Sequence, residues 1–212
     1  MKRSLIIPVL VAAMLLCACA APAVSADTNK PYVSVSFGYA DGLRYAPSYA
    51  IWVQDEAGNV ATLYATAKAA ADSWGSQPRE NVLPVWKGVR EGADVVSGAT
   101  PKNGASLTLN IPETFVGKKL TLYIEANASY DYNEYYAEGL SEGDAGYNDV
   151  NGQPSVVWTM TLDPSTPTGT AAPALAGTGE VLGADHAVHE TEHLTTAAGL
   201  LTDITVEWKL GE

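Results

Sequence analysis

The chain has very little cysteine, with only Cys17 and Cys19 among its 212 residues. Both lie in or beside an N-terminal segment typical of a secretory signal, so cleavage after Ala26 leaves a mature chain without cysteine. Disulfide bonds, thiol catalysis and cysteine-ligated zinc are then excluded from the mature protein. We therefore expect the fold to be held by its hydrophobic core alone.

Long hydrophobic runs are lacking outside the N-terminus. Residues 5–16 form an uncharged apolar run that is short for a transmembrane helix, and Val24-Ser25-Ala26 fits a signal-peptidase site. These features predict a signal peptide over residues 1–26 and a single β-sandwich domain over residues 27–212. The segment Leu16-Cys17-Ala18-Cys19 also resembles a bacterial lipobox, which would make the protein a lipoprotein anchored at Cys19. Both alternatives place it in the periplasm or otherwise outside the cytoplasm.

Basic residues are scarce. The whole chain has 12 lysines and arginines against 24 acidic residues, and losing Lys2 and Arg3 with the signal leaves ten against 24, a formal net charge of −14. Such an acidic chain is disfavoured as a partner of nucleic acid or of an anionic membrane surface. The charge is compatible with binding of cations or of a basic protein.

Motifs of common enzymes are missing as well. The sequence has no G-x-S-x-G, no H-E-x-x-H and no G-x-x-x-x-G-K-[ST], and only three histidines. No pair of carboxylates stands out as an acid and a base. We therefore expect a protein that is not an enzyme but a binding or electron-transfer accessory.

Short runs of β-branched and aromatic residues alternate with polar ones and are separated by glycine, proline, asparagine and aspartate. They predict an all-β fold, an antiparallel immunoglobulin- or fibronectin-like sandwich of about seven strands. One or two short helices are expected in long connections, over residues 67–73 and 81–90. The predicted strands cover residues 32–39, 45–54, 60–66, 106–111, 120–130, 155–162 and 204–210.

The segment from Asp94 to Thr100 reads D-x-x-S-G-A-T. It resembles the sequence on which ApbE-type flavin transferases attach FMN, through a phosphoester to the last threonine. The resemblance implies covalent FMN on Thr100, with small neighbours that let a transferase reach the hydroxyl and an isoalloxazine ring that carries the electrons. The alternative is a tight turn that leads into a strand. The residues of this predicted cofactor site are Asp94, Ser97, Gly98, Ala99 and Thr100.

A wider resemblance covers nearly the whole mature chain. The runs RYAPSYAIWVQDEAGN, LPVWKG, DVVSGATPKNG and LTLYIEANASYDYNEYY, in that order, resemble a family of periplasmic proteins of unknown function, domain of unknown function 2271. The resemblance implies a β-sandwich module in a flavin- or iron-linked redox system outside the cytosol. It also implies a PepSY-type membrane redox protein and an ApbE-type flavin transferase as partners, and no assigned catalytic residues.

All three histidines, His186, His189 and His193, fall within eight residues, with Asp185, Glu190 and Glu192 among them. On a helix, spacings of three and four would place the imidazoles on one face, suited to a divalent transition metal such as Zn²⁺, Cu²⁺ or Ni²⁺. The alternative is a solvated polar loop whose histidines titrate freely.

Residues 126–136 (ANASYDYNEYY) combine tyrosines with small polar residues. If they form one strand, Asn127, Ser129, Asp131 and Asn133 share a face, which suggests a surface for an extracellular ligand or a Ca²⁺ ion. The alternative is the solvent-facing side of a strand that continues into a tyrosine-rich loop.

Overall fold

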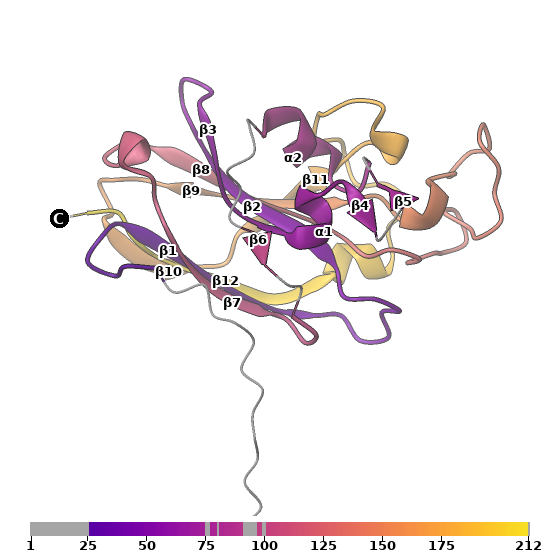
Figure 1. The fold of residues 1–212 in the computed structure, drawn as a ribbon, viewed down its shortest axis with the longest axis horizontal. Helices are drawn as coiled ribbons and strands as arrows, with labels where there is room; N and C mark the ends of the chain where they lie inside the picture. The colour runs from indigo at the N-terminus through magenta and orange to yellow at the C-terminus, as the bar shows by residue number, and fades with distance from the viewer. Residues whose placement is uncertain (1–25, 75–76, 80, 91–96, 99–100, 212) are drawn as a thin grey trace, which may run out of the picture.

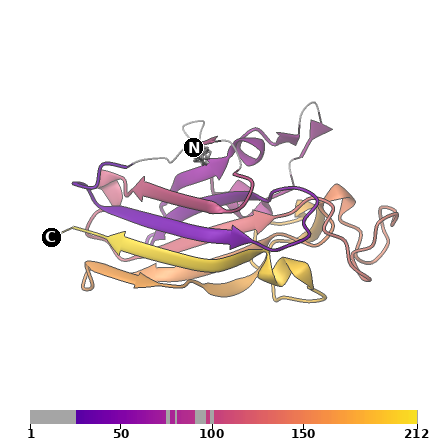
Figure 2. The same cartoon turned by 90° about the horizontal axis from the view of Figure 1, so that it is seen from below.

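The computed structural model describes residues 26–74, 77–79, 81–90, 97–98 and 101–211. Residues 1–25 of the predicted signal, with both cysteines, and Asp94, Ala99 and Thr100 lie outside these described residues. The described chain is a sandwich of two β-sheets (Figures 1 and 2), which confirms the all-β sandwich predicted from the sequence. None of its helices is long and apolar enough to cross a membrane.

The smaller sheet has four antiparallel strands in the order β10-β12-β1-β7. Its middle strand β1 shows the predicted alternation, since Val33, Val35 and Phe37 are buried while the residues between them are half-buried. The strands are β10 (Thr168–Ala171), β12 (Leu201–Lys209), β1 (Tyr32–Tyr39) and β7 (Ala105–Asn110).

The larger sheet has six strands in the order β11-β9-β8-β2-β3-β6. Its first five strands pair antiparallel, and the two-residue strand β6 pairs parallel to β3 at the edge. The strands are β11 (Ala174–Thr178), β9 (Val156–Leu162), β8 (Leu120–Asn127), β2 (Ser48–Asp55), β3 (Val60–Thr66) and β6 (Ser97–Gly98).

The main core lies between the two sheets, where apolar side chains of alternate residues meet. Tyr49, Ile51 and Val53 of β2 face Val33 and Val35 of β1 within this cluster. Each large apolar side chain buried in this way contributes about 1.5–3 kcal/mol relative to an exposed one. This core therefore holds the two sheets together.

A second core covers the outer face of the larger sheet. Here Trp52 and Val157 of the sheet contact Leu83 and Trp86, and the Trp52 ring stacks on Tyr123 with centroids 5.0 Å apart. Two short helices, α1 (Ala67–Ala70) and α2 (Pro84–Val89), lie over this face (Figure 1). Both fall in the segments where the sequence predicts short helices, and the apolar residues of 81–90 explain why α2 packs down.

The remaining elements are short. The loops around residues 131–150 and 180–200 gather at one end of the sandwich (Figures 1 and 2). The short elements outside the two sheets and the two helices are the two-stranded ribbon β4 (Ser73–Trp74) with β5 (Gln77–Pro78), and the 3-10 turns η1 (Glu113–Phe115), η2 (Asp149–Asn151), η3 (Val181–Gly183) and η4 (Thr196–Gly199).

Candidate functional site

A closed loop at the end of β11 holds a histidine between two carboxylates. The loop begins and ends at an isolated bridge in which the Thr178 N–H donates to His189 O (3.0 Å) and the His189 N–H donates to Thr178 O (2.8 Å). Gly177 lets the strands approach, because a Cβ there would lie 2.1 Å from the His189 carbonyl oxygen. The residues between the bridged pair therefore form a closed loop, the ring of residues 179–188, whose two ends are held together by the bridge.

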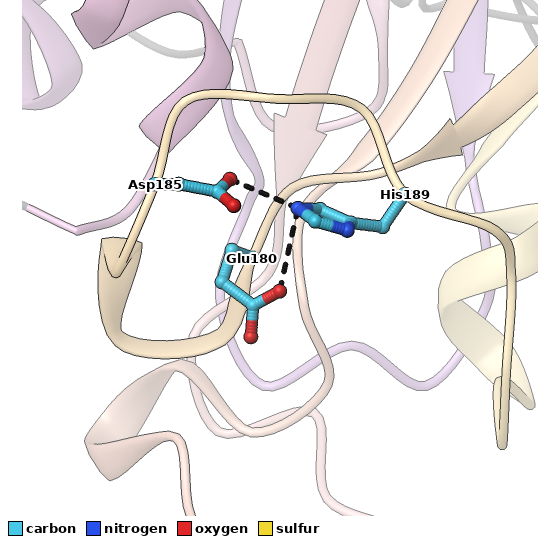
Figure 3. A group of neighbouring side chains, drawn as sticks. All are labelled: Glu180, Asp185 and His189. Carbon is cyan, nitrogen blue, oxygen red and sulfur yellow. Dashed lines mark hydrogen bonds and ion pairs between the residues drawn. The ribbon is translucent and has the colours of Figure 1, made fainter.

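Glu180, Asp185 and His189 point into this ring (Figure 3). The His189 Nε2 lies 2.9 Å from Asp185 Oδ1 and 3.4 Å from Glu180 Oε2. One ligand atom from each of the three residues lies within 4.8 Å of the other two. A single ion of transition-metal size, with bonds of about 2.0–2.2 Å, can contact all three atoms after small adjustments.

The charges in this cluster stabilise one another. The hydrogen bond with Asp185 raises the pKa of His189, and the same bond together with the Ala187 N–H lowers the pKa of Asp185. The proton on Nε2 thus sits between two carboxylates. A metal ion, which binds the neutral imidazole, would replace that proton at the same position.

The loop that carries these residues is tied to the rest of the fold. His186 Nδ1 lies 2.8 Å from the Pro84 carbonyl oxygen at the start of α2, and the Leu182 N–H donates to Asn148 Oδ1 at 2.8 Å. Gly88 leaves room for this contact, since a Cβ there would lie 2.2 Å from the His186 Cβ. These contacts fix the ring of residues 179–188 against α2.

The three histidines do not form the predicted cluster. Residues 184–195 contain no helix, so the shared helical face on which that prediction depended is not formed. Only His189 joins the group of candidate ligands, because the His186 ring binds Pro84 and the His193 ring stacks on Tyr135 with centroids 3.9 Å apart. Sequence reasoning missed Glu180, which the Thr178–His189 bridge brings close.

A cavity of about 450 Å³ opens beside His189. His189 and Glu180 line it, and the tyrosine-rich loop supplies a further part of its wall through Tyr135 and Tyr136. The Tyr136 hydroxyl donates to the Glu192 carbonyl oxygen at 3.5 Å, which ties the walls together. The full lining is Tyr135, Tyr136, Gly146, Pro154, Thr178, Gly179, Glu180, Val181, His189, Glu190 and Glu192.

A buried carboxylate lies behind the cavity wall. Glu125 has no exposed surface, and its two oxygens accept the N–H groups of Val85 (3.2 Å) and Trp86 (2.7 Å) and the hydroxyl of Ser155 (2.6 Å). These bonds lower its pKa, but burial outweighs them and raises the pKa to about 7. Glu125 thus caps α2 from inside the protein, and sequence reasoning did not single it out.

The tyrosine-rich segment does not continue strand β8 as predicted. The strand ends at Asn127, whose side chain is buried and donates to the Gln153 carbonyl oxygen. Ser129 accepts a hydrogen bond from Arg79, and Asp131 accepts one from the Thr196 hydroxyl. A shared strand face was therefore the wrong expectation, because Tyr130 adopts a φ of 65° and turns the chain away.

The described part of the predicted flavin-acceptor segment is Ser97 and Gly98, which form the edge strand β6. The sequence predicted small neighbours around the hydroxyl, and Gly98 does not adopt a positive φ. A Cβ at Gly98 would instead lie 2.7 Å from the Tyr64 hydroxyl oxygen, so close approach requires the glycine. Asp94, Ala99 and Thr100 lie outside the described residues.

Comparison with known proteins gives no relative. No family model matches the chain, and neither a curated protein nor a solved structure is significantly similar to it. The resemblance to domain of unknown function 2271, the flavin transferase and the PepSY-type partner therefore stay predictions.

Proposed function

We propose that this protein is a non-catalytic binding module that holds a divalent transition metal through Glu180, Asp185 and His189. The observation that carries the proposal is the convergence of one imidazole nitrogen and two carboxylate groups within 4.8 Å of one another. An imidazole with carboxylates suits Zn²⁺, Cu²⁺, Fe²⁺ or Ni²⁺ better than Ca²⁺ or Mg²⁺, which take oxygen ligands.

The wider context supports cation binding. The chain carries a formal net charge of −12, and the cavity beside the cluster is lined by the further acids Glu190 and Glu192. The negative field raises the local concentration of any cation. Expected export would place the module outside the cytoplasm, as an accessory that binds a metal without transforming it.

Replacing His189 with alanine is expected to weaken Zn²⁺ or Cu²⁺ binding at least tenfold, because it removes the only nitrogen ligand of the cluster. Isothermal titration of the tag-free mature protein measures this. The matched control is His193→Ala. It removes an imidazole from the same segment, but that imidazole stacks on Tyr135 and does not belong to the cluster of three ligands. Equal losses in the two variants, or no metal binding by the wild type, would contradict the proposal.

A second candidate function is electron transfer by FMN on Thr100, in a redox system with the predicted transferase and membrane partner. Its support is that Ser97 and Gly98 form the outermost strand of the larger sheet, paired on one side only. The described part of the segment therefore lies at the edge of the sheet and not at its centre.

Co-expression with an ApbE-type flavin transferase tests this second candidate. We expect the intact mass of the mature protein to rise by one covalent FMN, and Thr100→Ala to abolish the gain. The control is Thr168→Ala, which removes the hydroxyl of an exposed threonine outside the motif and should leave the modification in place. An unmodified wild-type mass, or a gain that persists in Thr100→Ala, refutes flavinylation at this residue.

A further inference from the structure

The cavity beside His189 bears on what a bound metal would do, and the inference rests on the proposed function. Among the three candidate ligands, Glu180 and His189 line the cavity, while Asp185 is not one of its lining residues. A metal held by all three would sit in the cavity wall. Three protein ligands would leave the fourth position of a tetrahedral ion open, and because two of the three line the cavity, we expect that position to face it.

The size of the cavity fits a small ligand. Its volume of about 450 Å³ falls in the range of small-molecule pockets, roughly 300–1,000 Å³. A ligand that occupies it reaches both the metal position and the tyrosine wall, since Glu180, His189, Tyr135 and Tyr136 all line the same space.

The charge of the lining selects against anions. Glu180, Glu190 and Glu192 all contribute to it, and no lysine or arginine is among the lining residues. A carboxylate, phosphate or halide donor would share the cavity with at least two carboxylates that the metal does not neutralise, those of Glu190 and Glu192, and like charges repel. The fourth ligand is therefore a neutral donor.

The tyrosine wall selects for a flat ring. Tyr135 already carries an imidazole, that of His193, stacked on it with an interplanar angle of 14°, and Tyr136 meets Tyr135 edge-on at 5.0 Å. Offset or edge contacts of this kind contribute about 0.5–1.5 kcal/mol beyond buried area. A planar ring with one basic nitrogen combines the metal bond with these contacts.

We infer that the metal-loaded protein binds a neutral nitrogen heterocycle of the imidazole class in this cavity, as the fourth ligand of the metal. The ligand is either a free heterocycle or the histidine side chain of another polypeptide, which offers the same ring and the same nitrogen.

The test uses the full tag-free mature protein loaded with one equivalent of Cu²⁺, followed by electron paramagnetic resonance. Adding imidazole should change the copper hyperfine pattern by adding a nitrogen donor, with saturation at one imidazole per copper and the metal retained. Acetate should bind at least tenfold more weakly. N-acetyl-glycyl-histidine amide forms the second arm: binding of both probes indicates a protein-borne histidine, and binding of imidazole alone indicates a free heterocycle.

Two variants separate the ring contacts and the charge from the metal site. Tyr135→Leu, at a side chain that is 39% exposed, should weaken imidazole binding about threefold to tenfold without changing copper affinity. The double variant Glu190→Gln/Glu192→Gln should reduce the ratio of the imidazole affinity to the acetate affinity, because it removes the negative charges that repel acetate. Copper spectra that imidazole leaves unchanged, removal of the metal by imidazole, or equal binding of acetate would overturn the inference while metal binding stands. Failure to bind copper at all would overturn the proposed function and this inference together.

Discussion

Replacing Glu125 with alanine is expected to lower the free energy of unfolding by about 3 kcal/mol at pH 5. The change leaves the N–H groups of Val85 and Trp86 and the hydroxyl of Ser155 without their acceptor in a site that has no exposed surface. A buried polar group without a partner costs about 1–3 kcal/mol, and the emptied volume adds to the loss. Urea unfolding monitored by tryptophan fluorescence measures the effect.

Glu125→Gln is the matched control for this prediction. The glutamine has the shape of the protonated acid: its oxygen can accept the Trp86 N–H, and its NH₂ group can donate to the Ser155 hydroxyl oxygen. Only the longer bond from the Val85 N–H is lost, so we expect a cost of about 1 kcal/mol at pH 5. Equal losses in the alanine and glutamine variants would show that the hydrogen bonds of this carboxyl do not hold α2.

The same carboxyl makes stability depend on pH, in a known direction. The pKa of Glu125 is raised to about 7 in the folded protein, whereas an unfolded glutamate titrates near 4.5. Between these values the folded state holds a proton that the unfolded state has released, so the contribution of Glu125 is complete below pH 4.5 and falls as the pH rises to 7. The total loss is about 3 kcal/mol by the linkage relation.

Comparing the wild type with Glu125→Gln isolates the pH-dependent contribution of Glu125 to the free energy of unfolding, because all other groups titrate alike in both proteins. The difference in the free energy of unfolding should shift by about 3 kcal/mol in favour of the variant between pH 4.5 and pH 7.5. The groups in contact with the carboxyl are the uncharged Val85 and Trp86 amides and the Ser155 hydroxyl, so burial alone carries the shift. A difference that stays constant over this range would contradict the raised pKa.

The sandwich could be predicted because apolar and polar residues alternate along most of its strands. Two predicted strands, β1 at Tyr32–Tyr39 and β3 at Val60–Thr66, match the structure at both ends. The edge strands β10 and β11 were missed, because their sequences TGTA and ALAGT consist mostly of small residues and are largely exposed, Leu175 included. Neither strand has a period-two alternation of buried and exposed residues, and only backbone pairing with β12 and β9 reveals them.

The candidate site was predicted only in part, for a related reason. The cluster around His189 stood out by composition, but the ligand set depends on Glu180, nine residues earlier, which the bridge between Thr178 and His189 brings back. The small residues around that bridge give no periodic signal. Glu125 had a visible signal, a single acid in the strand LTLYIEAN, and the apolar segment of α2 that covers it was expected to pack.

Replacing Gly179 with alanine is expected to destabilise the protein by about 3 kcal/mol, because it intrudes on this same buried network. A Cβ at Gly179 would lie 2.5 Å from Ser155 Oγ, 2.6 Å from Pro84 Cγ and 3.1 Å from Glu125 Oε1. The proline ring is rigid and starts α2, and the hydroxyl is held by Glu125, so neither neighbour moves without loss. Overpacking of this kind costs about 1–3 kcal/mol, to which the broken hydrogen bond adds.

Gly199→Ala is the control for that substitution, since a Cβ there meets nothing within 4 Å and the residue has no positive φ. It should change the free energy of unfolding by less than about 1 kcal/mol. A double-mutant cycle sharpens the test. Ser155→Ala should cost about 1 kcal/mol alone and less in the Gly179→Ala background, because there it also removes the oxygen with which the new Cβ clashes. Additive losses in the double variant would show that the strain does not come from Ser155. A smaller loss than the sum of the two single losses shows that the hydrogen bond between Ser155 and Glu125 leaves no room for a side chain at residue 179. This hydrogen bond lies directly behind the cavity wall that contains Glu180 and His189.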